Sequence, residues 1–281
     1  MSVGLLAELI RTRQPCVVLT GAGISTESGI PDFRSPAGIW AEYDPMEYGT
    51  ISAFQRDPVK VWDFYALRFE VLTRAEPNAG HLALAQLERH GLVRAVVTQN
   101  IDGLHERAGS RDVVEVHGSI RTAGCLGCGE HVPLAHVVTA LEDAPAPPKF
   151  RVEGSLGAVT SGGLIGVAGR ARDSSEAEPQ AVPQCPACGE ILKPDVVMFG
   201  ELLPVDAIDR ATALAREAAL LLVVGSTLEV YPIAALPEDT LAAGGELAIV
   251  NRGSTRYDRR AAVRIDGSAG EALSGVAEAL C

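Results

Sequence analysis

The sequence predicts an α/β fold in which a Rossmann-like parallel sheet carries helices on both faces and a smaller lobe is attached to it. Three observations lead to this prediction. Short apolar runs alternate along the chain with amphipathic stretches, two regions interrupt that alternation, and four of the 6 cysteines form two C-x-x-C pairs. A chain of 281 residues, 47% of them hydrophobic, is long enough for a single domain with a sizeable core.

The alternation itself defines the larger lobe. Six apolar runs rich in branched residues predict buried strands, over residues 17–20, 95–98, 113–116, 220–224, 247–250 and 262–265. Amphipathic helices are predicted at the N-terminus, where the pattern does not fit a signal peptide, and over residues 78–90, 204–218 and 270–280. Such alternation is typical of a parallel sheet covered on both faces, so we assign the larger lobe to residues 1–34, 75–120 and 195–281.

The two interrupting regions predict the smaller lobe, which we assign to residues 35–74 and 121–194. The first region is mostly helical, and Asp57-Pro58 marks a helix start, with Asp as the N-cap and Pro in the first helical position. The second region contains all four paired cysteines. Within it, residues 143–184 are rich in Ala, Gly, Pro and Ser, and we expect them to form a flexible excursion.

The paired cysteines predict one zinc ion. The motifs CLGCGE and CPACGE supply Cys125, Cys128, Cys185 and Cys188, a set that matches a tetrahedral site with four thiolate ligands. The alternative is a redox C-x-x-C, which needs only one pair. Because four thiolates leave no open coordination position, we expect the zinc ion to be structural.

Composition limits the classes of partner. The net charge of −12 argues against unspecific nucleic-acid binding, which needs a basic face. No apolar run approaches the roughly 20 residues that span a membrane. Two C-x-x-C pairs and two lone cysteines fit a reducing compartment better than a disulfide framework. We therefore expect a cytoplasmic protein that binds neither nucleic acid nor membrane.

Candidate binding residues follow the predicted strands. Gly21-Ala22-Gly23 follows the first strand, where the backbone can approach a pyrophosphate, but the third glycine of a dehydrogenase fingerprint is replaced by Thr26 and Pro31 soon interrupts any helix. Gly225-Ser226-Thr227 and Asn251 end two further strands. Each of these strand ends has an ordinary strand-to-loop turn as its alternative, but ligands of open parallel sheets bind at this edge.

The strand over 95–98 is followed by Gln99, Asn100 and Asp102, and the strand over 113–116 by His117. Asn100 and Asp102 either contact a ribose and an amide or cap the next helix. A lone histidine is often structural, but one at this edge is also suited to act as a general base, since its pKa lies near neutrality.

These strand ends belong to a longer series of motifs. In chain order they are GAGIS (21–25), GIPDFR (29–34), TQNIDGLHERAG (98–109), EVHG (115–118), the two C-x-x-C pairs, VVMFGE (196–201), GSTLEVYP (225–232) and IVN (249–251). Together they strongly resemble the sirtuin family of NAD-dependent protein deacylases of the bacterial type. The motifs span nearly the whole chain, and only the segment between the cysteine pairs is longer than usual in the family.

The resemblance implies a reaction that consumes NAD by breaking the bond between nicotinamide and ribose. The amide oxygen of an acylated lysine attacks the ribose, His117 acts as general base with Asn100 and Asp102 beside it, and the products are lysine, nicotinamide and O-acyl-ADP-ribose. Acylated proteins would be the substrates of a monomeric enzyme. Transfer of ADP-ribose to protein, NAD hydrolysis and NAD sensing without catalysis are the alternatives.

The resemblance also implies the binding residues. The phosphates, nicotinamide ribose and adenosine of NAD would contact Gly21, Ala22, Gly23, Asp32, Phe33, Arg34, Gln99, Asn100, Ile101, Asp102, Gly225, Ser226, Thr227, Asn251, Arg252 and Gly253. Residues 196–201 would pair as a strand with the substrate peptide, through Val197, Met198, Phe199, Gly200 and Glu201.

A final pattern concerns the acyl group. Tyr65 and Arg68 are three residues apart and share one face of their predicted helix. One interpretation is a half-buried Tyr beside a solvated Arg. The other is that the pair resembles the Tyr-x-x-Arg of sirtuins that remove succinyl and malonyl groups. In that case Arg and Tyr would bind the terminal carboxylate of the acyl group. Gly49 matches the small residue that widens the acyl pocket in those sirtuins. Asp32 in GIPDFR is more typical of the deacetylases, so simple deacetylation is the alternative.

Overall fold

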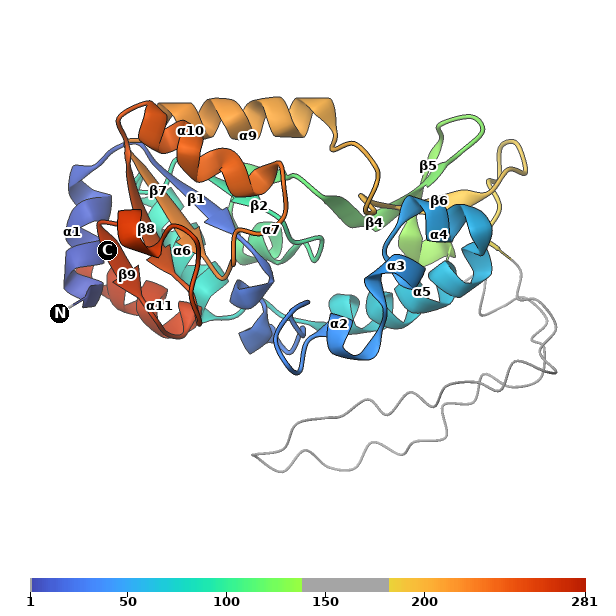
Figure 1. The fold of residues 1–281 in the computed structure, drawn as a ribbon, viewed down its shortest axis with the longest axis horizontal. Coiled ribbons are helices and arrows are strands. Elements are labelled where there is room, and N and C mark those ends of the chain that lie inside the picture. The colour runs from blue at the N-terminus through green and yellow to red at the C-terminus, as the bar shows by residue number, and fades with distance from the viewer. Residues whose placement is uncertain (1, 138–181) are drawn as a thin grey trace.

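A six-stranded parallel sheet forms the centre of the larger lobe in the computed structural model, which describes residues 2–137 and 182–281 (Figure 1). The strands are ordered β3-β2-β1-β7-β8-β9, and each neighbouring pair is parallel. Their bounds are β1 (Cys16–Thr20), β2 (Ala95–Thr98), β3 (Val113–Glu115), β7 (Leu220–Val224), β8 (Glu246–Val250) and β9 (Val263–Ile265). The Rossmann-like sheet and all six predicted strands are confirmed.

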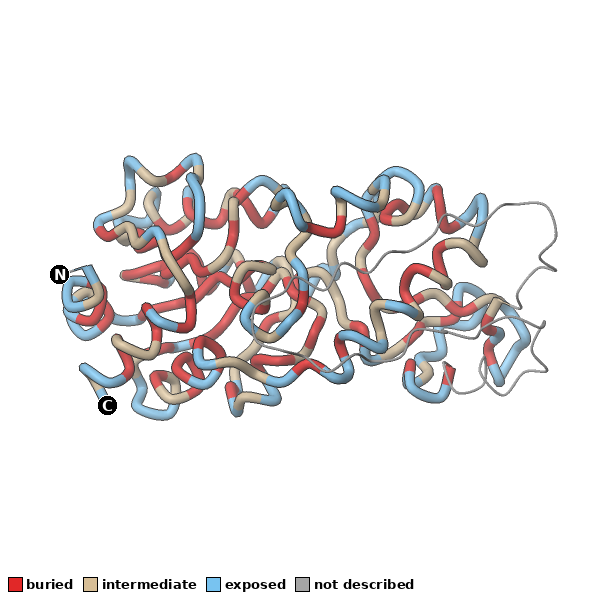
Figure 2. The backbone as a smooth tube through the Cα atoms, turned by 90° about the horizontal axis from the view of Figure 1, so that it is seen from below, coloured by how far each residue is buried: buried red, intermediate tan, exposed pale blue. Residues whose placement is uncertain are grey.

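Helices cover both faces of this sheet because neighbouring residues of each strand point to opposite sides. Val18 and its equivalents in the other strands pack against α1 (Ser2–Thr12), α6 (Ala79–Arg89) and α11 (Ala269–Leu280). Leu19 and its equivalents pack against α9 (Val205–Glu217) and α10 (Leu236–Ala242) on the opposite face. The strands are therefore buried on both sides, as the red segments at the centre of the larger lobe in Figure 2 show.

The smaller lobe combines a three-stranded antiparallel sheet with a helical layer. The sheet has the order β5-β4-β6, with β4 (Gly118–Cys125), β5 (His131–Pro133) and β6 (Leu192–Val196). The helices are α2 (Ile39–Glu42), α3 (Pro45–Tyr48), α4 (Ile51–Arg56) and α5 (Pro58–Arg74). The indole N–H of Trp62 in α5 donates to the carbonyl oxygen of Leu192 in β6 at 2.9 Å, which joins the two layers. The helical region was predicted, whereas the three strands were not.

Two local predictions for the smaller lobe have different outcomes. Helix α5 begins at Pro58, and the Asp57 side chain accepts a hydrogen bond from the N–H of Lys60, so the predicted helix start is confirmed. The excursion predicted over 143–184 lies outside the described residues except for 182–184. The residue bounds of the two lobes remain a prediction, because β4 and β6 run from one lobe to the other. No helix in the described part of the chain is long and apolar enough to cross a membrane.

The expected pairing of residues 196–201 with a substrate peptide stays a prediction. Strand β6 ends at Val196, and the chain turns at Gly200, whose φ is +90°. The N–H groups of residues 197–199 donate in order to the carbonyl oxygen of His117 (2.9 Å), the Glu201 carboxylate (2.8 Å) and the carbonyl oxygen of Gly49 (2.8 Å). Residues 197–201, called the 197–201 loop below, are therefore held in place by two other parts of the chain and by the carboxylate of Glu201 within the loop.

Candidate active site

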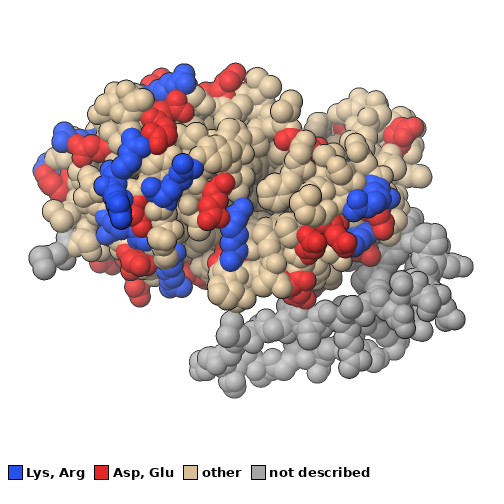
Figure 3. Space-filling model, in the orientation of Figure 1, with Lys and Arg blue, Asp and Glu red and all other residues tan. Residues whose placement is uncertain are grey.

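A cavity of about 590 Å³ lies between the two lobes at the carboxyl edge of the parallel sheet. The loops that follow β1, β2, β3, β7 and β8 form its larger-lobe walls, and α5 and the 197–201 loop form the smaller-lobe wall. Basic and acidic side chains are interspersed over the face of the molecule seen in Figure 3, so this face carries no continuous basic surface. The volume lies within the range of sites that bind small molecules and cofactors.

The loops after β1 and β7 touch each other because glycines stand at their contact. Gly225 has a φ of +62°, and its carbonyl oxygen accepts a hydrogen bond from the N–H of Gly23 at 2.9 Å. A Cβ atom added at Gly23 would lie 2.7 Å from the Cα of Gly225. Beyond this contact the chain forms two short 3₁₀ turns, η1 (Ala22–Ile24) and η2 (Thr26–Ser28), and no dehydrogenase-type helix. The loop therefore stays beside the cavity, as its sequence predicts.

Asn100 and Asp102 are held against the first glycine loop by hydrogen bonds. Asn100 Nδ2 donates to the carbonyl oxygen of Gly21 and to Ser25 Oγ, both at 3.1 Å. Ser25 Oγ donates to Asp102 Oδ2 at 2.7 Å, and Asp102 Oδ1 accepts from the N–H of Leu104 at 2.9 Å. Asp102 thus supports the start of α7 (Leu104–Ala108) with one oxygen and fixes Ser25 with the other, while it also lines the cavity.

His117 follows β3 and lines the same cavity. Its Nδ1 lies 3.0 Å from the carbonyl oxygen of Gln99. Because a carbonyl oxygen only accepts, Nδ1 carries a proton, and the neutral ring has its basic lone pair on Nε2. Burial lowers the pKa of His117, the hydrogen bond to Gln99 partly offsets this, and the charge of Arg34 lowers the pKa further. The environment therefore favours the neutral form that a general base needs.

The segment with Asp32, Phe33 and Arg34 forms the outer wall of the cavity. Asp32 Oδ1 accepts hydrogen bonds from the N–H groups of Arg34 (3.0 Å) and Ser35 (2.8 Å), so it shapes the loop. Arg34 forms an exposed ion pair at 3.3 Å with Glu229, which lies in the loop after β7. This segment therefore connects the loops after β1 and β7 across the cavity mouth.

The loop after β8 contributes two of its three predicted residues. Asn251 and Arg252 line the cavity, and Asn251 Nδ2 donates to the carbonyl oxygens of Arg252 (2.9 Å) and Gly253 (3.2 Å). Gly253 is not part of the cavity lining, and its N–H donates to Asp266 at 3.2 Å. The structure brings every other predicted cofactor residue to the cavity, but it places Gly253 behind Asn251.

Tyr65 and Arg68 line the smaller-lobe end of the cavity. Arg68 is partly buried, and its guanidinium carbon lies 5.4 Å from the ring centre of Phe33 and 5.5 Å from that of Phe64. Burial lowers the pKa of Arg68, while the nearby tyrosine hydroxyls raise it. Burial raises the pKa of Tyr65 to about 12, so its hydroxyl keeps its proton. Within the described residues, Arg68 makes no ion pair with a carboxylate.

Gly49 lines the same end of the cavity. A Cβ atom added there would lie 3.1 Å from the ring of Trp40 and 3.4 Å from the ring of Phe199. A larger side chain at this position would therefore extend between these aromatic rings, so the glycine keeps this end of the cavity open.

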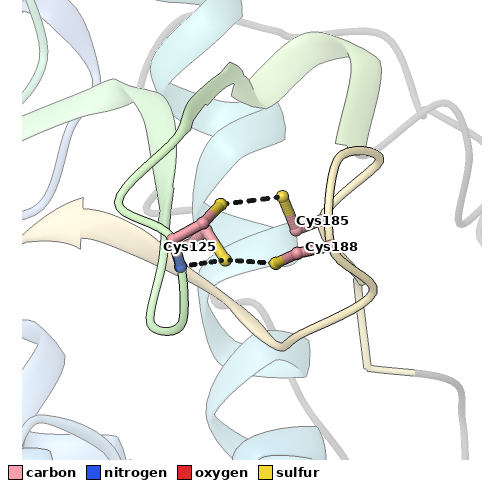
Figure 4. Close-up of side chains that lie close together, drawn as sticks. Cys125, Cys185 and Cys188 are labelled. Atoms are coloured by element: carbon pink, nitrogen blue, oxygen red, sulfur yellow. Dashed lines mark hydrogen bonds between the residues drawn. The ribbon is translucent and has the colours of Figure 1, made fainter.

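The four paired cysteines come together in the smaller lobe, where their sulfur atoms all lie within 4.8 Å of one another. Figure 4 shows Cys125, Cys185 and Cys188 where the loop after β4 faces the loop before β6. The Sγ atoms of Cys125 and Cys188 are 3.4 Å apart, and those of Cys128 and Cys185 are 3.7 Å apart. Tetrahedral zinc with bonds of about 2.3 Å separates its sulfur ligands by roughly 3.8 Å. The donor set and its spacing fit one structural zinc ion.

The sequence analysis missed several polar residues beneath the site. Ser25 was part of a motif but was given no role, although it joins Asn100 to Asp102. His81 and His105 were also given no role, yet they are buried with ring centres 4.9 Å apart. His105 Nε2 lies 2.9 Å from Thr20 Oγ1 at the end of β1. Only tertiary structure brings these residues together, so no local sequence signal could have identified them.

Comparison with known proteins connects this geometry to a family. The sequence model described as the Sir2 family matches residues 21–232. The NAD-dependent protein deacylase 2 of Pyrobaculum aerophilum is 42% identical over 97% of this chain and 94% of its own length. The NAD-dependent protein deacetylase of Caldivirga maquilingensis is 40% identical over 95% of this chain and 89% of its own length.

Solved structures show the same fold. A Sir2 complex with a p53 peptide and NAD⁺ covers 99% of this chain and 98% of its own, with 34% identity and a TM-score of 0.80. Sir2Tm bound to a propionylated peptide covers 100% of both chains, with 34% identity and a TM-score of 0.79. The match of sequence and structure extends over both lobes, and this chain therefore belongs to the Sir2 family.

Proposed function

We propose that this NAD-dependent protein-lysine deacylase prefers lysines that carry acidic acyl groups, such as succinyl and malonyl. The observation that carries the proposal is Arg68, a partly buried guanidinium that lines the cavity beside the Tyr65 hydroxyl. The planar guanidinium can bind a terminal carboxylate through two hydrogen bonds, and Tyr65 adds a third donor. Gly49 leaves room for the longer acyl chain. The bacterial type, a monomeric state and a cytoplasmic location remain predictions.

NAD would lie across the carboxyl ends of β1, β2, β7 and β8, and when bound it supplies the ribose carbon that receives the acyl oxygen. The backbone around Gly21 and Gly225 would approach its phosphates, and Asn251 and Arg252 would lie on the adenosine side. Gln99, Asn100 and Asp102 would orient the nicotinamide half. The Phe33 ring at the cavity mouth would keep water from the reacting carbon.

His117 would take a proton from a ribose hydroxyl through Nε2, because its Nδ1 is held by the Gln99 carbonyl. The acyl-lysine would enter beside the 197–201 loop. A substrate peptide that pairs with this loop would use backbone groups of the loop other than the N–H groups of residues 197–199, since those three are engaged within the chain.

Protein ADP-ribosylation and NAD hydrolysis are the alternatives for the same site. Incubation with NAD, with and without an acyl-lysine peptide, separates them from deacylation. We expect nicotinamide release that depends on the peptide and yields free lysine. Release of nicotinamide without peptide would indicate hydrolysis, and no release would indicate a sensor.

The acyl preference is tested by kcat/KM for matched succinyl-lysine and acetyl-lysine peptides. We expect the wild-type protein to prefer succinyl-lysine. Arg68→Met should reduce desuccinylation by roughly 1.5–3 kcal/mol, or about tenfold to 150-fold, the scale of a hydrogen bond to a charged group, and should largely spare deacetylation. Arg74→Met is the matched control, since Arg74 lies on the same helix, pairs with Glu70 and is 72% exposed. A wild-type preference for acetyl-lysine would refute the proposal.

A further inference from the structure

A carboxylate lies in the smaller-lobe wall of the cavity, where the proposed preference for acidic acyl groups requires a positive charge. Glu201 lines the cavity together with Tyr65 and Arg68. An isolated negative charge at this position would repel the carboxylate of a succinyl or malonyl group, since like charges close together repel more strongly where water is partly excluded. A cavity that admits an acidic acyl group therefore needs this charge to be compensated.

Lys193 of β6 provides a compensating charge from behind the cavity wall. Its Nζ donates to Glu201 Oε2 at 3.1 Å and to the carbonyl oxygens of Pro194 and Val196, both at 2.9 Å. The lysine side chain is only 12% exposed and that of Glu201 is 24% exposed, so water screens the pair weakly. With three acceptors around it, the ammonium group has its geometry fixed by the chain.

The same ion pair also shapes the 197–201 loop. Glu201 Oε2 accepts a hydrogen bond from the N–H of Met198 at 2.8 Å, so the carboxylate closes the turn at Gly200. Through Val197 and Phe199, this loop contacts the backbone of His117 and of Gly49. Lys193 therefore has two separable effects: it neutralises a charge in the cavity wall and it supports a loop.

We propose that Lys193 is a specificity-determining residue that allows acidic acyl groups to enter by neutralising Glu201. The inference rests on the proposed preference of this enzyme for acidic acyl groups. Lys193 touches neither the acyl group nor NAD, and it acts through Glu201. Loss of its charge should therefore penalise succinyl-lysine and leave the intrinsic handling of acetyl-lysine much less affected.

The test measures the ratio of kcat/KM for succinyl-lysine to kcat/KM for acetyl-lysine. Lys193→Met, which keeps the length and removes the charge, should lower this ratio about tenfold, the scale expected for an uncompensated charge near the ligand. Lys193→Arg should keep the ratio. Adding Glu201→Gln to Lys193→Met should restore it, because the amide keeps an acceptor oxygen without the charge.

The matched control is Lys60→Met. Lys60 forms an ion pair with Glu47 in the same lobe but does not line the cavity, so its loss should leave the ratio unchanged. If Lys193→Met does not fold, Glu201→Gln alone decides: the charge effect predicts a ratio equal to or above that of the wild type, and a lower ratio contradicts it.

Equal losses of both activities in Lys193→Met would overturn the inference, since a loop support alone affects both substrates. A lowered ratio that Glu201→Gln does not restore would overturn it as well. The wild-type ratio separately tests the proposed acyl preference, so a protein that prefers acetyl-lysine refutes that proposal, whereas only the change of the ratio in the variants refutes the role of Lys193.

Discussion

The two lobes hold their site residues in different ways. In the larger lobe, aliphatic layers bury a regular parallel sheet, and residues such as Asn100 and His117 sit where strands end. In the smaller lobe, an aromatic-rich core with Trp62 and Phe64 packs around a short sheet and a four-cysteine cluster. The regular sheet and the hydrogen bonds at its strand ends therefore position the predicted cofactor side, whereas side-chain packing and a cysteine cluster that fits a metal ion support the predicted acyl side.

Loss of zinc should affect the stability of the two lobes most differently. Zinc in small modules contributes about 10–16 kcal/mol to folding, which is as large as the whole stability of many domains. Cys188→Ser, or treatment with a chelator, should therefore unfold the smaller lobe and abolish deacylation, because α5 is joined to β6 next to the cluster. Circular dichroism should show that most of the signal of the larger lobe remains.

Cys281→Ser is the control, since Cys281 is exposed and lies outside the cluster. Metal analysis should find one zinc ion per chain in this variant and in the wild-type protein. Fully active protein that contains no zinc would contradict a structural role for the metal.

The contrast between the lobes also explains what the sequence predicts. The parallel strands are continuous apolar runs, and polar residues at their ends share one edge, so the cofactor side of the site could be located from local patterns. β4 and β6 are interrupted by polar residues, and among residues 2–137 and 182–281 they form a sheet with β5 alone, so their local pattern is weak. Their register depends on packing against α5 and on the cysteine cluster.

The same limit applies to individual residues. The motif VVMFGE does not indicate that the chain turns at Gly200 or that the Glu201 carboxylate accepts a hydrogen bond from the N–H of Met198. Lys193 reaches Glu201 only because β6 and this loop fold against each other. Tyr65 and Arg68 could be predicted together because helical spacing alone places them on one face.

Substitution of His117 should affect the functions of both lobes, because His117 contacts both. It follows the larger-lobe strand β3, and its carbonyl oxygen accepts a hydrogen bond from the N–H of Val197 in the 197–201 loop. His117→Ala should lower kcat for deacylation by about 10²–10⁴-fold, the usual contribution of a general base, while calorimetry still detects NAD binding. His90→Ala is the control, since His90 is exposed at the end of α6. Near wild-type turnover in His117→Ala would remove this residue from the mechanism.

Acid should act on the larger lobe through His81 and His105, and this is the smallest of the three expected effects. Burial and, to a smaller extent, the neighbouring His81 lower the pKa of His105 to about 3. Burial lowers the pKa of His81 to about 4, against the opposing charge of Asp102. The unfolded chain binds protons at these histidines below a pKa of about 6.5, whereas the folded chain does not until pH 4 or below. The free energy of unfolding therefore falls as the pH falls from 6.5, by about 2 kcal/mol per histidine at pH 5.

Urea unfolding at pH 7.5 and pH 5 tests this effect. Between the two pH values, His105→Gln should lose less free energy of unfolding than the wild-type protein, and the exposed-site control His90→Gln should lose as much as the wild type. Carboxylates contribute equally to all three proteins, so an identical loss in His105→Gln and in the wild type would show that His105 does not carry the acid sensitivity.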